Sequence, residues 1–221
     1  KQDMQKKYVI FDFDGTLFDT SAGIIHGLRH ALEARGYTIG NDAELYKFIG
    51  PPLLIPAFME FYGMSEEEAA EAKRIYRAYY GEKGVFECTP YPGAEECLRA
   101  LRAAGRKLAV ATSKPLQFAR QILERYGFDK YFDSICGVES DVYESKAETI
   151  SRALKELGAS ASECVMVGDR KYDILGAAEN GIPCVAFDSG FAEEGEYAAA
   201  GAAAVVKDYA ELERFLLGGK H

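Results

Sequence analysis

The sequence predicts an α/β fold built on a parallel sheet, with an all-helical domain inserted after the first strand. From residue 94 onward, short apolar runs alternate with stretches of helical periodicity, a pattern typical of parallel sheets. The first apolar run covers residues 8–11, the next strand-like run begins near residue 107, and only helical patterns lie between them. A chain of 221 residues is long enough to bury a core in both parts.

The first strand is expected at residues 8–11, Tyr-Val-Ile-Phe, which are apolar and favour β structure. A continuous apolar run that ends in a turn is typical of a buried strand in a parallel sheet. Open α/β sheets bind their ligands beyond the carboxyl ends of the strands. Residues 12–16, which follow this strand, are therefore expected to lie at a functional edge of the sheet.

The inserted domain is expected to contain only helices. Apolar residues at helical spacing predict a helix over 21–36, and Ser65 with Glu68 three residues later predicts the start of another helix, which runs to about Tyr80. Residues 81–92 contain several glycines and prolines and are expected to form a linker. These patterns divide the chain into an α/β core, residues 1–16 and 89–221, and a helical domain, residues 17–88.

The remainder of the core follows the same alternation of strand and helix. Because strands and helices alternate, all of these strands are expected to join residues 8–11 in one parallel sheet. The expected strands cover residues 107–112, 134–136, 164–167, 183–187 and 203–206, and the expected helices cover 94–104, 115–126, 146–157, 172–180 and 208–217.

Composition and charge limit the classes of function. The formal net charge is −9, and so acidic a chain is poorly suited to bind nucleic acid or an anionic membrane. No apolar run approaches the roughly 18 residues of a membrane span, and the polar residues 1–7 lack the apolar stretch of a signal peptide. The five cysteines include no C-x-x-C pair and are expected to be buried, reduced thiols. We therefore expect a cytoplasmic protein whose partners include neither a nucleic acid polymer nor a membrane.

Two carboxylates, Asp12 and Asp14, follow the first expected strand. Side chains two positions apart point to the same side of a strand, whereas Phe13 between them points to the other side. Two acidic groups at the mouth of a sheet are unfavourable unless a cation neutralises them. Magnesium takes oxygen ligands, often one or two carboxylates with waters and a substrate phosphate. This pair therefore indicates a site for Mg²⁺.

A second acidic pair, Asp169 and Asp173, lies after the strand expected at 164–167. Asp169 directly follows this apolar strand, at the same sheet edge that is expected to hold Asp12, which favours a shared metal site. Asp173 comes four residues later, in the first turn of a helix. The alternative is that Asp173 serves the helix and not the metal site, because the helix dipole stabilises an acidic side chain in the first turn.

Two further segments offer groups that bind anions. Residues 112–115 (Thr-Ser-Lys-Pro) end a strand and begin a helix, where a hydroxyl and backbone amides can hold phosphate, although a simple N-cap before a proline fits about equally well. Lys146 begins the helix expected at 146–157. A cation at the beginning of a helix opposes the helix dipole, which suggests that Lys146 has a role other than stabilising the helix. The alternative is that Lys146 is a solvated surface lysine.

Taken together and in this order, the motifs resemble those of the haloacid dehalogenase superfamily of phosphohydrolases. They are D-x-D-G-T at residues 12–16, the strand-end Thr112, Lys146, and G-D-x-x-x-D at residues 168–173. The resemblance covers nearly the whole chain. It implies a Rossmann-like parallel sheet core and phosphatase activity, and the helical insertion is similar to the first type of cap in that superfamily.

The resemblance also implies the catalytic and metal-binding roles. Asp12 would attack phosphorus and form an aspartyl phosphate, while Asp14 would serve as general acid and then general base. Mg²⁺ would be held by Asp12, by the backbone carbonyl of Asp14 and by Asp169. Asp173 would act through a bound water or by orienting its neighbours.

A third group of residues would bind the transferring phosphoryl oxygens. The resemblance assigns this role to Thr112, Ser113 and Lys146, whose donors would stabilise the charge of the transition state. Lys114 is a rival to Lys146 for this role. Many relatives have a proline after the motif lysine, where this chain has Ala147.

Within the superfamily, the chain resembles the branch of phosphoglycolate phosphatases and 5′-nucleotidases. Residues 48–53 are similar to the cap loop of that branch, so Gly50 and Pro51, with Lys47 nearby, are the expected contacts to the leaving group. The implied partner is a small phosphorylated metabolite that is hydrolysed as a phosphomonoester. A sugar phosphomutase and a pyrophosphatase are the alternatives, and the oligomeric state, monomer or dimer, stays open.

Overall fold

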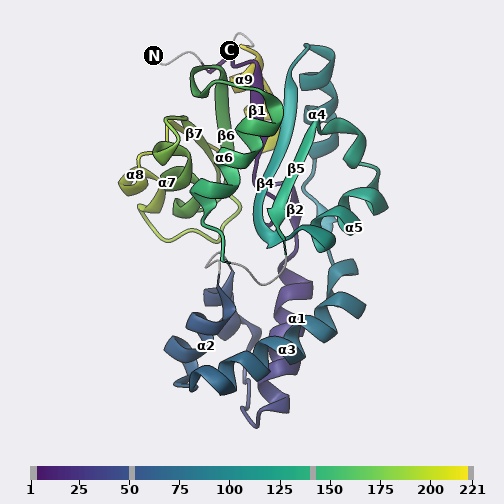
Figure 1. Ribbon diagram of the computed structural model, residues 1–221, viewed down its shortest axis with the longest axis vertical. Coiled ribbons are helices and arrows are strands. Elements are labelled where there is room, and N and C mark those ends of the chain that lie inside the picture. Colours follow the sequence, from purple (N-terminus) through teal and green to yellow (C-terminus); the bar gives the residue numbers. More distant parts are fainter. Residues whose placement is uncertain (1–3, 50–52, 140–142, 219–221) are drawn as a thin grey trace. The chain divides into compact units, whose positions relative to one another are not determined.

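The computed structural model describes residues 4–49, 53–139 and 143–218. The chain divides into two compact units, and Figure 1 labels most of their helices and strands. The core unit consists of residues 1–18 and 90–221, and the helical unit consists of residues 19–89.

A six-stranded parallel sheet forms the centre of the core unit, which confirms the predicted fold class. In the strand order β5-β4-β1-β6-β7-β8, β1 pairs with β4 on one side and with β6 on the other (Figure 1). The chain extends the sheet first to one side of β1 and then to the other, which places a topological switch point beside this central strand. The strands are β1 (Tyr8–Phe11), β4 (Lys107–Pro115), β5 (Ser134–Val138), β6 (Cys164–Gly168), β7 (Cys184–Phe187) and β8 (Ala204–Val206).

Helices pack on this sheet and against one another. α6 packs on β4 and β5, α7 packs on β6 and β7, and the two helices contact each other. α4 and α5 both pack on β4, and α4 also contacts α9. The helices of the core unit are α4 (Ala94–Ala103), α5 (Leu116–Tyr126), α6 (Lys146–Leu157), α7 (Lys171–Glu179), α8 (Glu196–Ala200) and α9 (Tyr209–Leu217), with short 3₁₀ turns η3 (Asp129–Tyr131) and η4 (Ala161–Glu163).

The alternation of side chains along β1 determines where the functional edge lies. Tyr8 and Ile10 belong to a buried apolar cluster that includes Ile150 of α6 and Ile174 of α7. Because side chains two residues apart point to the same face of a strand, Asp12 continues toward the face that these two helices cover. The carboxyl end of β1 therefore meets the beginnings of α6 and α7.

The carboxyl end of β4 differs from the prediction. The strand continues to Pro115 instead of ending at Thr112, and its pairing with β5 becomes irregular between Ala111 and Pro115. The N-cap of α5 is Pro115, which has no side-chain acceptor, so the N-cap interpretation of this segment is wrong. The Thr112 hydroxyl instead accepts a hydrogen bond from the Lys114 amide at 3.1 Å, the kind of local turn that threonine favours.

The helical unit is built around a small apolar core that includes Leu28, Leu32 and Tyr80. The capping box predicted before its last long helix is confirmed, because Ser65 and Glu68 each accept a hydrogen bond from the backbone amide of the other. The elements of this unit are α1 (Ser21–Ala34), η1 (Asp42–Phe48), α2 (Leu54–Tyr62), α3 (Glu66–Glu82) and η2 (Gly84–Phe86). The short strands β2 (Phe18–Asp19) and β3 (Thr89–Pro90) pair with each other, and each spans a boundary between the units.

The cysteines are buried within the folded chain. All five are buried, and none of them forms a disulfide in the part of the chain that the structure describes, which confirms the expectation of buried thiols. Burial raises the pKa of Cys97 to about 12 and the pKa of Cys136 to about 11, so both thiols remain protonated at neutral pH. Across the described ranges, no helix is both long enough and apolar enough to cross a lipid bilayer.

Candidate active site

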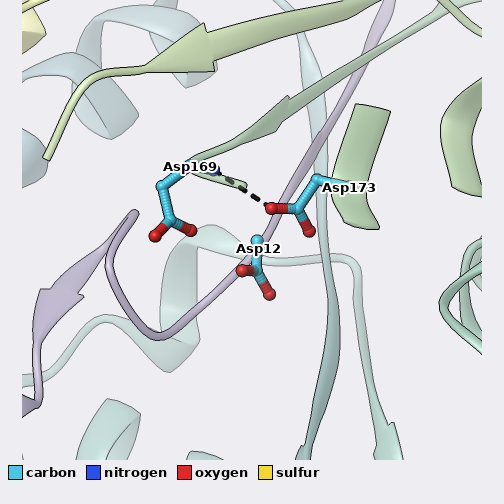
Figure 2. Close-up of side chains that lie close together, drawn as sticks. All are labelled: Asp12, Asp169 and Asp173. Atoms are coloured by element: carbon cyan, nitrogen blue, oxygen red, sulfur yellow. Dashed lines mark hydrogen bonds between the residues drawn. The ribbon is translucent and has the colours of Figure 1, made fainter. Parts of the chain in front are cut away.

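Three carboxylates from separate segments meet at the carboxyl edge of the sheet. Asp12 follows β1, Asp169 follows β6, and Asp173 lies in the first turn of α7. One oxygen of each carboxylate lies within 4.8 Å of the corresponding oxygens of the other two, and Figure 2 shows the three side chains grouped together. The predicted meeting of Asp12 and Asp169 is thus present, and Asp173 joins them directly.

The loop between β6 and α7 is shaped by Asp173. Its Oδ2 accepts hydrogen bonds from the backbone amides of Asp169 and Arg170, both at 3.1 Å, and the first of these is the dashed line in Figure 2. Gly168 makes room for this arrangement, because a Cβ at that position would lie 2.3 Å from the Cβ of Asp173. The G-D-x-x-x-D spacing therefore serves the local fold as well as the carboxylate cluster.

Asp169 is held by hydroxyl groups from two other segments. Its side chain accepts a hydrogen bond from Thr16 Oγ1 at 3.0 Å and another from Ser189 Oγ at 3.4 Å. Thr16 is positioned in turn by Tyr209 of α9, whose hydroxyl donates to the Thr16 carbonyl at 2.5 Å. Because Asp169 is only 2% exposed, these bonds replace hydration that burial has removed.

Gly15 lies so close to the same carboxylate that a side chain at this position would clash with it. Its φ is +78°, in the left-handed region, and a Cβ there would lie 2.1 Å from Asp169 Oδ2. We expect Gly15→Ala to destabilise the fold by about 2–4 kcal/mol, through backbone strain and the clash together. Gly105→Ala is the matched control, because Gly105 has a φ of +77° and open space around it. Gly105→Ala introduces only the backbone strain of a left-handed residue, which costs about 1 kcal/mol. Urea unfolding of both variants checks the difference, and equal losses would show that the contact with Asp169 is unimportant.

Lys146 joins the carboxylate cluster from the first position of α6. Its Nζ lies 2.6 Å from Asp12 Oδ1 and 2.9 Å from Asp173 Oδ1, and it also donates to the Ala111 carbonyl at 2.7 Å. Gly176 of α7 faces it, where a Cβ would come within 3.1 Å of the Lys146 side chain. The interpretation of Lys146 as a solvated surface lysine is therefore wrong.

Asp14 has a separate lysine partner. Lys114 Nζ lies 2.8 Å from Asp14 Oδ1, although the two residues are 100 positions apart in the chain. Phe13, between the two aspartates, is completely buried and stacks on Phe18 with 5.0 Å between ring centroids. Asp12 and Asp14 therefore have different surroundings, and the side chain of Asp14 does not belong to the cluster of three.

The remaining candidates for phosphate binding lie on β4, beside β1. Thr112 is 1% exposed, and Ser113 is half-buried. Both belong to the irregular end of this strand, where backbone groups depart from regular pairing. Backbone amides in irregular segments at a sheet edge are the kind of group that binds anions.

Electrostatics indicate that this cluster suits a cation. Burial, together with the negative charge of Asp173, raises the pKa of Asp12 to about 7, although Lys146 acts in the opposite direction. Burial and the charge of Asp12 likewise raise the pKa of Asp169 well above its ordinary value. Lys146 is the only basic side chain that contacts Asp12 and Asp173 among the described residues. An all-oxygen donor set with excess negative charge fits a hard divalent ion such as Mg²⁺.

The predicted contacts to the leaving group belong to the helical unit. Gly50 and Pro51 lie outside the described residues. Lys47 lies in η1, where its Nζ is 4.8 Å from the ring centroid of Phe61 and 5.1 Å from that of Tyr62. Its role in substrate binding stays a prediction.

Some residues of the site carried no usable signal in the sequence. Ser189 follows the strand β7, so its place at a carboxyl end was the only available indication. Tyr209 acts through Thr16 from a helix near the other end of the chain, and its type and spacing give no hint of this. The pairing of Lys114 with Asp14 likewise depends on β4 lying next to β1.

Comparison with known proteins identifies the class to which this fold and site belong. Residues 9–187 match the family model of haloacid dehalogenase-like hydrolases. The chain therefore belongs to the haloacid dehalogenase-like hydrolase family, and the resemblance drawn from its motifs is confirmed.

Individual relatives carry several activities in their names. A 5′-nucleotidase of Pseudomonas aeruginosa is 40% identical over 209 residues, which are 94% of each chain. The tyrosine-protein kinase PtkA of Mycobacterium tuberculosis is 39% identical over 184 residues, 83% of this chain and 62% of that protein. A phosphoglycolate phosphatase of Agrobacterium fabrum is 31% identical over 190 residues, 83% of this chain and 81% of that one.

A solved structure shows the same arrangement of the chain. The crystal structure of a predicted phosphatase from Clostridium acetobutylicum matches with a TM-score of 0.91 at 38% identity. The match covers 96% of this chain and 99% of that one. The sheet, the helices of both units and their order along the chain are therefore those of a known hydrolase fold.

Proposed function

We propose that this protein is a Mg²⁺-dependent phosphatase of small phosphomonoesters that works through a phosphorylated Asp12. The observation that carries the proposal is the position of Asp12. It lies at a topological switch point, within 4.8 Å of two further carboxylates and in contact with a buried lysine. Family membership and the names of the relatives support the same reaction class.

In the first half of the reaction, an oxygen of Asp12 attacks phosphorus. A bond forms between this oxygen and phosphorus, the bond between phosphorus and the leaving oxygen breaks, and protonated Asp14 gives its proton to that oxygen. Alcohol leaves and Asp12 carries the phosphoryl group. Asp14 suits this task because its side chain lies outside the carboxylate cluster.

In the second half, water attacks the phosphorus of phosphorylated Asp12. Asp14, now ionised, accepts a proton from the water, and the bond between phosphorus and the Asp12 oxygen breaks. Inorganic phosphate leaves, Asp12 is regenerated as a carboxylate, and Asp14 is protonated again for the next cycle. Two displacements of moderate difficulty replace one that is hard.

The metal would be held by Asp12, the backbone carbonyl of Asp14 and Asp169, with Asp173 supporting them. When bound, Mg²⁺ would offset the repulsion between an anionic nucleophile and an anionic phosphate. Lys146 holds Asp12 by its Oδ1 and would contact the phosphoryl oxygens, together with Thr112 and Ser113.

The substrate would be a small phosphorylated metabolite, with a nucleoside monophosphate or phosphoglycolate as leading candidates. The names of two relatives support these choices. The helical unit would act as a cap whose residues Gly50, Pro51 and Lys47 contact the leaving group. A sugar phosphomutase would require a sugar bisphosphate as activator, and a pyrophosphatase would prefer pyrophosphate to every monoester. A cytoplasmic location agrees with a substrate of this kind.

A panel of phosphorylated metabolites tests the proposal. We expect release of inorganic phosphate from at least one monoester in the presence of Mg²⁺, loss of this release in EDTA, and its recovery when Mg²⁺ is added in excess. The panel includes a nucleoside monophosphate, phosphoglycolate, a sugar phosphate with and without its bisphosphate, and pyrophosphate, ranked by kcat/KM. No release above the buffer rate from any of them would refute the proposed activity.

A further inference from the structure

Each of the two aspartates of the D-x-D motif has its own buried lysine. Lys146 contacts Asp12 at 2.6 Å and also reaches Asp173, whereas Lys114 contacts Asp14 at 2.8 Å. The proposed function uses Lys146 at the phosphoryl group and gives Lys114 no task. A lysine whose side chain is only 6% exposed is unusual unless a partner holds its charge.

The position of Lys114 in β4 explains why its side chain is so constrained. The Thr112 hydroxyl accepts a hydrogen bond from the Lys114 amide, which holds the backbone of this irregular segment. The Lys114 ammonium lies 5.9 Å from the ring centroid of Phe13, a residue that is itself fully buried between the two aspartates. The stem and the head of Lys114 are thus both confined, and its donor position is fixed relative to the D-x-D segment.

Fixing one oxygen of Asp14 has a chemical consequence. A carboxyl group that transfers a proton must keep the transferring oxygen at hydrogen-bond distance from the leaving oxygen, and small displacements slow the reaction strongly. The bond from Lys114 occupies Oδ1 of Asp14 and restricts rotation of the carboxyl group.

We infer that Lys114 is a positioning residue that orients the carboxyl group of Asp14 for proton transfer to the leaving oxygen. This inference rests on the proposed function, because it assigns Lys114 a task within that reaction. It separates the two lysines by role. Lys146 acts on the nucleophile and the phosphoryl group, whereas Lys114 acts only through Asp14. From the sequence motifs alone, the two lysines are rivals for one phosphate site.

Leaving groups of different quality test this assignment. An aliphatic alkoxide needs a proton in order to leave, whereas p-nitrophenolate leaves readily without one. We expect Lys114→Met to lower kcat by about 100-fold for an aliphatic phosphomonoester and by only a few-fold for p-nitrophenyl phosphate. In an Asp14→Asn background the same substitution should cause no further loss, because two residues that act as a unit are not additive.

Lys107→Met is the matched control, since Lys107 is an exposed lysine at the start of the same strand. It should leave both substrates unaffected. If Lys114→Met lowers both substrates equally and weakens inhibition by inorganic phosphate, Lys114 binds phosphate and the inference is wrong. Equal losses with a lower Tm would show a structural role and would also overturn it. If the wild-type protein hydrolyses neither substrate, the proposed function itself fails.

Discussion

Asp12→Asn is expected to lower kcat/KM by about 10⁴- to 10⁶-fold while leaving the fold intact. The amide cannot attack phosphorus to give a phosphorylated side chain, so the two-step route is closed. Asp12 is also one of three crowded carboxylates whose burial raises its pKa to about 7. Removing its charge relieves repulsion from Asp173, and we expect the variant to unfold at an unchanged or higher urea concentration than the wild type. Phosphate release in the presence of Mg²⁺ and urea unfolding in EDTA are the measurements.

Asp188→Asn is the control for this substitution. Asp188 directly follows β7, as Asp12 follows β1, but it is exposed and stands outside the carboxylate cluster. Its replacement should leave kcat/KM within a factor of about two, because surface substitutions away from special features change little. An Asp12→Asn variant that kept a tenth or more of the wild-type activity would rule out Asp12 as the nucleophile.

Lys146→Met is expected to reduce both stability and activity. Burial alone would lower the pKa of Lys146, but Asp12 and Asp173 raise it above its ordinary value, so the lysine is a buried cation held by two anions. Removing one partner of a buried ion pair leaves uncompensated charge and typically costs about 3–5 kcal/mol. We expect a loss of that size in the free energy of unfolding, measured by urea in EDTA. Activity should fall by about 10²- to 10³-fold through loss of charge stabilisation in the transition state.

Lys155→Met provides the comparison on the same helix. Lys155 lies in the last turn of α6, is exposed, and should contribute less than about 1 kcal/mol through the helix dipole. If Lys146→Met were as stable as Lys155→Met in EDTA, the three contacts of Lys146 would contribute nothing to folding. If it also kept full activity, Lys114 would be the better candidate for the phosphate site.

The fold could be predicted from the sequence because its signals are local. The apolar run at residues 8–11 became β1, and the helix predicted over 146–157 became α6 with the same ends. The strand at residues 107–112 was predicted too short, because the irregular pairing of β4 with β5 extends it to Pro115, and no residue pattern encodes that pairing. Parallel strands are joined by long connections, so their register depends on contacts that local patterns do not contain.

The site was easiest to predict where a residue lies at the end of a strand. Asp12 and Asp169 follow apolar strands, and the shared edge of a parallel sheet brought them together as expected. Asp173 was expected to act through a bound water or by orienting its neighbours, yet its carboxylate belongs to the cluster. Gly168 leaves room for the Asp173 side chain beside the carboxyl end of β6. Lys114 and Tyr209 contribute through contacts of high sequence separation. The contacts of Lys114 with Asp14 and of Tyr209 with Thr16 depend on the strand order and the helix packing, which residue types alone do not specify.

The central place of β1 in the sheet has a consequence for biosynthesis. Its two neighbours are residues 107–110 and residues 164–167, so a ribosome releases Asp12 long before the strands that flank it. A nascent chain that ends before residue 164 has one open edge on β1 and lacks both Asp169 and Asp173. Such a chain exposes unpaired backbone groups and apolar surface, which is the state that chaperones protect. The carboxylate cluster is therefore assembled only after residue 173 has been made.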